Sequence, residues 1–216
     1  VLPRPLRSLD TTGDLILTER EVAVPGLAPA FNGFTIVQVA DIHFGQRLEM
    51  ESYLVGVREF VNQLNADVVV FTGDLVDRRR DIARAVKYHA GFRARLGCLC
   101  VLGNHDYWTR PDRILEYLRQ TPIHWLGTGE RRILKRNGRR LIFSGTDYPW
   151  DKSMKDWRRA IRRETGDAVV FLSHTPDNAP AAAREGASLI LSGHNHGGQI
   201  CFPLAGPLVV PSRYGL

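Results

Sequence analysis

Five short segments of this 216-residue chain carry side chains of the kinds that bind metal ions. They are Asp41-Ile-His43, Gly73-Asp74, Gly103-Asn104-His105-Asp106, His174 and Gly193-His194-Asn195-His196. Carboxylate, imidazole and amide groups together suit borderline divalent ions, and the absence of cysteine from the set argues against a structural zinc site. The sequence therefore indicates metal-ion chemistry at a site assembled from distant loops.

Each segment alone carries little weight, because Asp-x-His pairs and Gly-Asp turns are common and residues 103–106 would also serve as a helix cap. Their shared context is more informative. Each segment directly follows an apolar, strand-like run, and glycines stand where the backbone must approach an ion. The seven potential ligands can supply two metal ions if one carboxylate bridges them; they are Asp41, His43, Asp74, Asn104, His174, His194 and His196.

Such a pair of ions would favour phosphoryl chemistry. Two ions about 3.5–4 Å apart can lower the pKa of a shared water, hold a phosphoryl oxygen and stabilise an in-line displacement without an amino-acid nucleophile. His105 adjoins a ligand but is not assigned as one, so we expect it to protonate the leaving oxygen or to stabilise transition-state charge. We expect Asp106 to orient the His105 imidazole as a hydrogen-bond acceptor.

The elements that must position these residues alternate between strand and helix in the first half of the chain. Apolar, β-branched runs at residues 34–40, 67–72 and 98–102 predict buried strands. Apolar residues at helical spacing predict helices over 50–64, 82–95 and 111–119. This βαβαβα order predicts parallel strands, whose carboxyl ends meet at one sheet edge and bring the candidate ligands together.

The pattern changes after residue 122. Asn137-Gly138, between residues 131–135 and 139–144, predicts a β-hairpin. The elements expected after it are a basic helix over 153–164, a strand at 168–172, a helix at 178–184, a strand at 188–191 and short strands near 199–201 and 208–210. We expect a single domain over residues 1–216, with an N-terminal hairpin and lead-in loop in residues 1–33 and the motif-bearing core in residues 34–202.

In this order the segments DIHFG, GDLVD, GNHD, SH and GHNHGG resemble the motifs of the calcineurin-like metallophosphoesterases over about residues 34–202. The resemblance implies an α/β sandwich of four layers, with two mixed β-sheets flanked by helices. Family chains usually continue past the stretch matching residues 211–216, so the last strands would be missing from this sequence or replaced by another closure. The resemblance also implies two divalent ions, which are Mn, Fe, Zn or a mixture. By motif position, Asp41, His43, Asp74 and His196 would bind one ion, and Asp74, Asn104, His174 and His194 the other, with Asp74 as the bridge.

A bacterial branch of the family gives a substrate expectation. Residues 197–200 and the lead-in at 24–34 are similar to phosphodiesterases that resemble UDP-2,3-diacylglucosamine pyrophosphatase. This implies hydrolysis of a phosphodiester or pyrophosphate bond in a lipid-linked or nucleotide-sugar substrate. Arg78, Arg79 and Arg80 are candidates for holding substrate phosphate, although a solvated face explains such a charge run as well. Trp150 and Trp157 are candidates for lipid or membrane contact, although an amphipathic helix packed on the core explains them nearly as well.

Composition favours an anionic partner, because 29 Lys and Arg residues against 23 acidic residues give a net charge of +6. We expect a phosphate-containing small molecule or lipid as substrate and peripheral membrane contact. No specific protein partner is inferred, and nucleic acid is disfavoured as a partner. A nucleic-acid or cyclic-nucleotide phosphodiesterase is the alternative enzyme, and a non-catalytic metal-binding scaffold is the alternative outside enzymes. No Gly-x-Ser-x-Gly or P-loop motif occurs, which disfavours serine hydrolases and P-loop enzymes.

The remaining features bear on location and on the core. No apolar run approaches the ~20 residues that cross a bilayer. The sequence begins at Val1, so a preceding anchor or signal stays open, and we expect a location in the cytoplasm or at the membrane surface. We expect Cys98, Cys100 and Cys201 to pack in the core, and His89 and His124 to be ordinary core or surface histidines.

Overall fold

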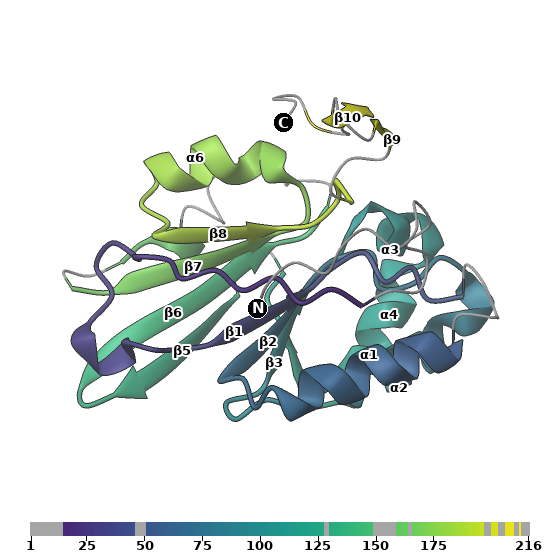
Figure 1. The fold of residues 1–216 in the computed structure, drawn as a ribbon, viewed down its shortest axis with the longest axis horizontal. Coiled ribbons are helices and arrows are strands. Elements are labelled where there is room, and N and C mark those ends of the chain that lie inside the picture. Colours follow the sequence, from purple (N-terminus) through teal and green to yellow (C-terminus); the bar gives the residue numbers. More distant parts are fainter. Residues whose placement is uncertain are drawn as a thin grey trace.

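A computed structural model describes residues 15–45, 51–127, 130–148, 159–163, 166–196, 200–202, 206–209 and 212. Two four-stranded β-sheets pack against each other, and helices cover their outer faces (Figure 1). This four-layer α/β arrangement confirms the fold class expected from the sequence. The layers matter for function because both sheets contribute loops to the candidate site.

The first sheet is entirely parallel, as the alternation of strands and helices predicts. Its order is β1 (Ile36–Val39), β2 (Val68–Thr72), β3 (Cys98–Val101) and β4 (Ile123–Trp125). The connections carry α1 (Glu51–Gln63), α2 (Ile82–Ala90), α3 (Asn104–Thr109) and α4 (Pro111–Leu118). Of these elements, β4 and α3 have no counterpart in the prediction.

Helix α2 is shorter than predicted, because the expected helix over residues 82–95 ends at Ala90. The Gly91 amide donates to the carbonyls of Tyr88 and His89, and the Phe92 amide donates to His89. These bonds tighten the last turn. The chain then bends so that Phe92 enters the core between the sheet and its helices. Burial of this one side chain outweighs the helical pattern of the residues that follow.

The second sheet contains β5 (Arg131–Arg136), β6 (Arg139–Thr146), β7 (Ala168–Ser173) and β8 (Leu189–Ser192) in that order. β5 and β6 are antiparallel, whereas β6, β7 and β8 are parallel. The predicted turn is present, with Asn137 at φ 50° and Gly138 at φ 72°, as a type I′ turn requires. Among the described strands, only this sheet is mixed. The expectation of two mixed sheets was wrong for the first sheet, whose described strands are all parallel because each connection between them crosses over through one or two helices.

Side-chain alternation along the strands explains the layers. In β2, Val68 and Val70 belong to the core between the two sheets, whereas Val69 and Phe71 pack under the helices. Cys98 and Cys100 are free and buried, as expected, and the side chain of Cys201 lies outside the described residues. The second sheet is covered on its outer face by a smaller cluster around Ile161, Phe171 and Ala182.

The ends of the chain bear on several predictions. Residues 15–28, the described part of the expected N-terminal hairpin, contain no strand, and the first element is the 3₁₀ turn η1 (Pro29–Phe31). Of the expected helix over 153–164, residues 159–161 are helical and 153–158 lie outside the described residues. Helix α6 (Ala179–Arg184) and the antiparallel pair β9 (Ile200–Phe202) and β10 (Gly206–Val209) follow. Within the described ranges, no helix is long and apolar enough to span a bilayer.

Candidate metal centre

The seven candidate ligands lie where strands of both sheets end. Asp41 and His43 follow β1, Asp74 follows β2, and Asn104 follows β3 in the first sheet. In the second sheet, His174 follows β7, and His194 and His196 follow β8. A hydrogen bond joins the two groups, because the His194 amide donates to both carboxylate oxygens of Asp41 at 3.0 and 3.1 Å. The sheets therefore meet at the site.

The loops that present these residues adopt an unusual backbone conformation. Seven described non-glycine residues have positive φ, and five of them are candidate ligands: Asp41, His43, Asp74, His194 and His196. For a residue with a Cβ atom this conformation costs roughly 1–2 kcal/mol. Strain of this kind persists where the surrounding structure enforces it, and it concentrates at functional sites.

Glycines allow the loops to approach one another. A Cβ atom on Gly103 would overlap Asp74 Oδ1, and one on Gly193 would lie 2.8 Å from Asp41 Oδ2. The backbone of each glycine thus borders a candidate carboxylate ligand on a different strand. In these two motifs the glycine is required by space, as the sequence suggested.

A first cluster of ligand atoms comprises Asp41, His43 and His196, which all lie within 4.8 Å of one another. His43 Nε2 lies 3.2 Å from His196 Nε2, and His196 Nε2 lies 3.6 Å from Asp41 Oδ1. Two imidazole nitrogens and a carboxylate oxygen therefore converge on one point.

A second cluster comprises Asp74, His174 and His194. His174 Nε2 lies 3.1 Å from His194 Nδ1 and 2.8 Å from the side-chain oxygen of Asn104. The amide of Asn104 thus joins this cluster.

Asp74 stands between the two clusters. Its Oδ2 atom lies 3.6 Å from His43 Nε2 in the first cluster and 3.4 Å from His174 Nε2 in the second. Its other oxygen, Oδ1, accepts a hydrogen bond from the His105 amide at 2.9 Å. This bond orients the carboxylate toward both clusters.

The partners of two imidazoles indicate that their free nitrogens are available as ligands. His174 Nδ1 donates to the Thr72 carbonyl at 2.8 Å, and His43 Nδ1 donates to Asp77 Oδ1 at 2.6 Å. In each neutral ring the proton then occupies Nδ1, so the lone pair of Nε2 points into the cluster. The donor set and its orientation fit a divalent metal ion.

Electrostatics divide the site into anionic and neutral groups. Burial opposes the ionised form of Asp74, but hydrogen bonding and charge from His174 lower its pKa below the ordinary value. Burial and the neighbouring His174 lower the pKa of His194. Burial also opposes protonation of His43, yet the Asp77 carboxylate raises the pKa of this ring. The ionised carboxylates give the site the negative charge that attracts a cation.

His105 lies beside the first cluster but is held by Asp77 rather than by Asp106. Its Nδ1 atom lies 2.9 Å from Asp77 Oδ1, and its ring centre lies 4.5 Å from that of His43. Asp77 therefore contacts His43 and His105 together. This residue was missed in the sequence, although it lies in the quoted GDLVD segment three residues after Asp74.

The expected contact of Asp106 with the His105 ring was wrong. Asp106 is fully buried, and its carboxylate accepts hydrogen bonds from the amides of Leu75, Val76 and Gly103. Adjacent helix positions point about 100° apart, so one carboxylate cannot easily support both the loop and the neighbouring ring. Burial raises the pKa of Asp106 to about 7 although the three amides favour its ionised form. Asp106 thus holds together the loops that carry Asp74 and Asn104.

Aromatic and basic side chains border His105. Trp108 is 64% exposed, and its ring centre lies 4.8 Å from that of His105. The Arg79 side chain donates to the Thr109 carbonyl at 3.0 Å, and the Arg80 side chain is 70% exposed. These groups place an indole and a basic loop near the candidate proton donor. Trp150 and Trp157 lie outside the described residues.

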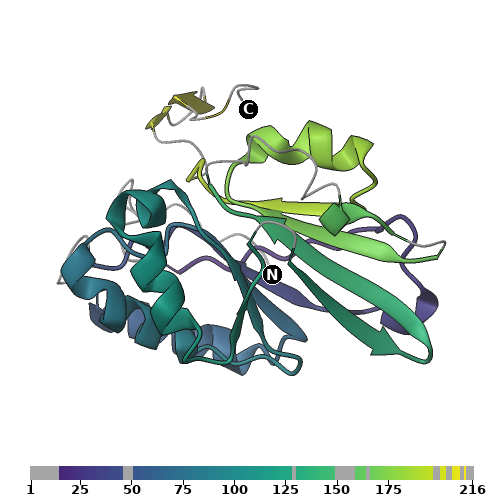
Figure 2. The same ribbon diagram turned by 180° about the vertical axis from the view of Figure 1, so that it is seen from behind.

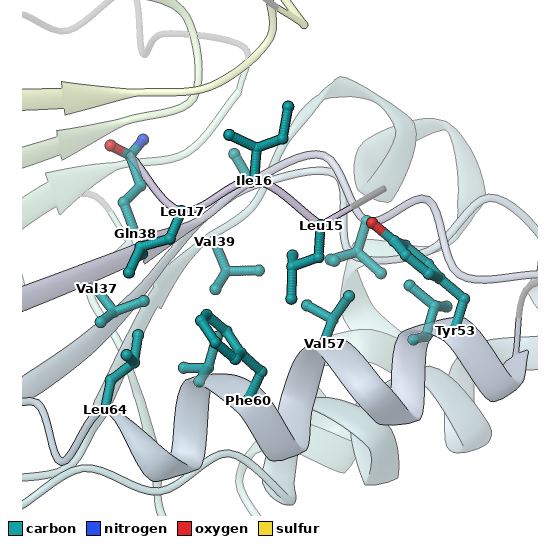
Figure 3. A pocket seen from close by; sticks show the side chains of 14 residues that line it. Leu15, Ile16, Leu17, Val37, Gln38, Val39, Tyr53, Val57, Phe60 and Leu64 are labelled. Atoms are coloured by element: carbon teal, nitrogen blue, oxygen red, sulfur yellow. The ribbon is translucent and has the colours of Figure 1, made fainter. Parts of the chain in front are cut away.

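A separate apolar groove lies between α1 and β1 (Figure 3). Its walls include Leu15, Val39, Val57 and Phe60, and none of the described residues that line it is charged. It also reaches Ile42, which lies between two candidate ligands in the sequence. None of its described lining residues is a His, Cys, Asp or Glu that could bind a metal ion. The loop cluster is therefore the better candidate for the reaction site.

Comparison with known proteins agrees with this geometry. The family model described as calcineurin-like phosphoesterase matches residues 34–198. A Danio rerio protein named "Transmembrane protein with metallophosphoesterase domain" is 32% identical over 197 residues, which are 85% of this chain and 45% of that protein. The chain thus spans about half the length of curated relatives that it matches.

Two further proteins bear on activity and on fold. UDP-2,3-diacylglucosamine pyrophosphatase LpxG from Chlamydia muridarum is 34% identical over 101 residues, which are 46% of this chain and 30% of that protein. The crystal structure of a 5′-nucleotidase precursor from Thermus thermophilus superposes with a TM-score of 0.57 at 18% identity, covering 84% of this chain and 47% of that one. The extent of the family match and the clustered ligand residues together show that the chain belongs to the calcineurin-like phosphoesterase family.

Proposed function

We propose that this protein is a dinuclear metal-dependent phosphoesterase that hydrolyses a phosphodiester or pyrophosphate bond. The observation that carries the proposal is the position of Asp74, whose Oδ2 atom lies within 3.6 Å of both ligand clusters. One carboxylate shared between two clusters is the arrangement that two closely spaced ions require.

The two clusters would each hold one ion. Asp41, His43, Asp74 and His196 form one set of ligands, and Asp74, Asn104, His174 and His194 form the other. The bound ions would activate a water nucleophile and neutralise charge on the phosphoryl oxygens. The hydrogen bonds that His174 and His43 donate to Thr72 and Asp77 would keep those rings in the ligating tautomer.

His105 would act on the leaving group. Its Nδ1 atom is held by Asp77, so Nε2 is the ring nitrogen left to donate a proton to the leaving oxygen. Asp77 would stabilise the protonated ring before transfer and orient it afterwards. Because Asp77 also contacts His43, the proton donor and one metal ligand would be positioned by the same carboxylate.

We further propose a lipid-linked or nucleotide-sugar substrate. Partial similarity to LpxG supports this class, as does the apolar groove that reaches Ile42 and would accept an acyl chain. The exposed indole of Trp108 would pack against the leaving group, and Arg78, Arg79 and Arg80 would bind a second phosphate. We also propose that residues 1–216 form a single domain.

The test combines metal analysis with a substrate panel. The protein purified with Mn or Zn should contain two ions per chain and hydrolyse bis-p-nitrophenyl phosphate faster than p-nitrophenyl phosphate. Hydrolysis of UDP-2,3-diacylglucosamine tests the finer substrate proposal separately. Asp74→Ala and Asn104→Ala should lose metal and activity together. Full activity with one ion or none would contradict the dinuclear proposal.

His105→Ala is the control for these ligand variants, because His105 lies beside the ligands but is not proposed to bind an ion. It should retain both ions and lose about 10²–10⁴-fold in turnover on a poor leaving group. Unchanged turnover on that substrate would show that another group supplies the proton.

A further inference from the structure

The positive charge of this protein is concentrated in one hairpin. Residues 131–140, which span β5, the turn and the start of β6, contain six of the chain's 29 basic residues and none of its 23 acidic residues. The rest of the chain therefore carries equal numbers of basic and acidic residues. The six are Arg131, Arg132, Lys135, Arg136, Arg139 and Arg140.

Four of these six side chains form no ion pair with any residue that the structure describes; they are Arg131, Arg132, Lys135 and Arg139. Of the other two, Arg140 pairs with Asp167 at 2.6 Å and Arg136 lies 3.6 Å from Asp67. Arginines on α4 and its cap differ, because Arg110 and Arg113 each pair with a nearby acid. The hairpin thus groups four cations without a described ion pair within ten residues, with no acidic residue among them.

The register of the hairpin places like charges opposite each other. Lys135 faces Arg140 and Arg136 faces Arg139 across the two strands. Directly opposed like charges destabilise an antiparallel pair, so the arrangement opposes folding of the hairpin. A bound anionic surface would remove the repulsion between Lys135 and Arg140, which share the outer face of the sheet. Arg136 lies on the inner face, over the rings of Phe31 and Phe34.

An apolar side chain projects among the cations. Leu134 is buried between the two sheets, so its neighbours Ile133 and Lys135 point to the opposite face, together with Arg131. Ile133 is 41% exposed there, between the two unpaired cations. β5 is the edge strand of its sheet, and the hairpin projects away from α1 and α2 (Figures 1 and 2).

We propose that this face of β5, formed by Arg131, Ile133 and Lys135, binds the surface of an anionic lipid bilayer. Lysine and arginine near such a surface each strengthen binding about fivefold, and an apolar side chain among them can enter the headgroup region. The exposed isoleucine favours a bilayer over nucleic acid, whose phosphate backbone offers no apolar contact at this position. Charged side chains on an edge strand also protect it against edge-to-edge pairing, so edge protection is the alternative that the test must separate.

The proposed surface does not overlap the metal centre. The turn at Asn137 precedes the start of β6, whereas His174 follows the opposite end of the neighbouring parallel strand β7. Arg131 lies opposite Ser144, toward the site end of the sheet, but β6 separates the edge strand β5 from β7. A bilayer along β5 therefore leaves the candidate reaction site open. Hydrolysis of a soluble diester should be unaffected by changes in this face.

The test is co-sedimentation with vesicles of phosphatidylcholine containing about 30% phosphatidylserine, beside vesicles of phosphatidylcholine alone. The protein should bind the anionic vesicles at low salt, and the partition coefficient should fall steeply as salt rises. Arg131→Gln with Lys135→Gln should weaken partitioning about 25-fold, and Ile133→Ser should weaken it several-fold at constant charge. The double variant Arg113→Gln with Arg119→Gln on the other side of the fold removes the same charge and should change binding less than threefold.

Several outcomes would overturn the proposal. Equal binding to both vesicle types would exclude charge recognition, and equal losses in the two double variants would show a net-charge effect without a specific face. Tighter binding to duplex DNA than to vesicles, lost in the β5 variant, would assign the face to nucleic acid. Self-association of the β5 variant, with no vesicle binding by the parent protein, would assign the charges to edge protection. Circular dichroism checks that each variant folds, and none of these readouts depends on enzymatic activity.

Discussion

At the scale of single residues, Asp77 links two tasks that are usually separate. Its Oδ1 atom contacts Nδ1 of His43, a candidate ligand, and Nδ1 of His105, the candidate proton donor. Burial opposes its ionised form, but hydrogen bonding and charge from His43 lower the pKa of Asp77 below the ordinary value. The carboxylate is therefore ionised when it faces the two rings.

Asp77→Asn should affect both tasks. Loss of the charge that supports His43 should weaken metal binding about 10–100-fold, as removal of a carboxylate behind a ligating histidine does elsewhere. Turnover at saturating metal should also fall, and more for an alkyl than for a nitrophenyl leaving group. Metal titration and a leaving-group series measure the two effects. A normal metal affinity would show that the contact with His43 is incidental.

Trp108 should govern the leaving-group side of substrate recognition. Trp108→Ala should raise KM for a nucleoside-containing diester about tenfold, because the substrate would lose the exposed indole that lies beside His105 and is proposed to pack against the leaving group. KM for methyl p-nitrophenyl phosphate should change little. Trp108→Phe is the control and should retain most of the affinity. Equal effects on both substrates would mean that the indole supports His105 instead of the substrate.

His89 should make stability depend on pH. It is fully buried against Phe71 and Phe92, and burial lowers its pKa to about 4. In the unfolded chain this histidine has a pKa near 6.5, so below that pH the unfolded state binds a proton that the folded state does not bind. The stability that neutral His89 contributes is therefore fully present above pH 6.5 and is lost as the pH falls toward 4. The free energy of unfolding should fall by roughly 3 kcal/mol over this range. Denaturant unfolding of the parent and of His89→Phe between pH 7 and 4.5 measures it, because other groups cancel in the difference. Parallel curves would contradict the expected shift.

At the scale of elements, the hydrophobic pattern allowed most of the fold to be predicted. Apolar, β-branched runs that end in polar or glycine-bearing turns located most strands of both sheets, and Asn137-Gly138 located the hairpin. β4 is only three residues long and was missed, because a short strand leaves no period to recognise. α3 was missed since its six residues are mainly polar or aromatic and its first turn carries the candidate site.

The candidate ligands were predictable for a different reason, namely that parallel strands deliver their carboxyl ends to one edge. The meeting of His194 with Asp41 follows from the packing of two sheets, which no local pattern encodes. The contacts of Asp77 and Asp106 were out of reach in the same way. The contacts of Asp77 and Asp106 depend on which of two adjacent residues in a loop or helix points inward. The spacing of residues in the sequence does not determine this direction.

Gly103 tests how closely the loops after β2 and β3 must approach. Gly103→Ala should displace the Asp74 carboxylate, because the new methyl group would overlap its Oδ1 atom. Metal content and activity should fall together, with a loss of about 1–3 kcal/mol in unfolding free energy. Gly56→Ala on α1 is the control, because no atom lies within 4 Å of its Cβ position. It should stabilise the protein by about 0.5–1 kcal/mol and leave metal content unchanged.

At the scale of the whole molecule, the candidate metal centre joins two sheets that also share an apolar core and a few polar contacts, such as the bonds that Asp147 accepts from Leu102 and Trp125. The first sheet supplies Asp41 and Asp74, and the second supplies His174 and His194. Ions bound between them would stabilise the packing of one sheet on the other. Metal binding should therefore protect the entire domain and not just the loops.

Adding metal to chelated protein should raise Tm. A single ion at 100 times its Kd contributes about 2.7 kcal/mol, which corresponds to about 5–10 °C for a domain of this size. Calorimetry at increasing Mn or Zn concentration measures the rise. Asp41→Asn should lose much of it, and an unchanged Tm in the parent protein would contradict a metal centre that joins the sheets.

The left-handed backbone at five candidate ligands has a consequence for evolution. Glycine at any of these positions would relieve about 1 kcal/mol of strain in the metal-free protein, and the effect should be clearest at His196, whose side chain is exposed. Random libraries selected for heat resistance without metal should accumulate glycine there, whereas libraries selected for hydrolysis should exclude it. Opposite selection at the same positions would show that the protein gives up stability to keep its ligands in place.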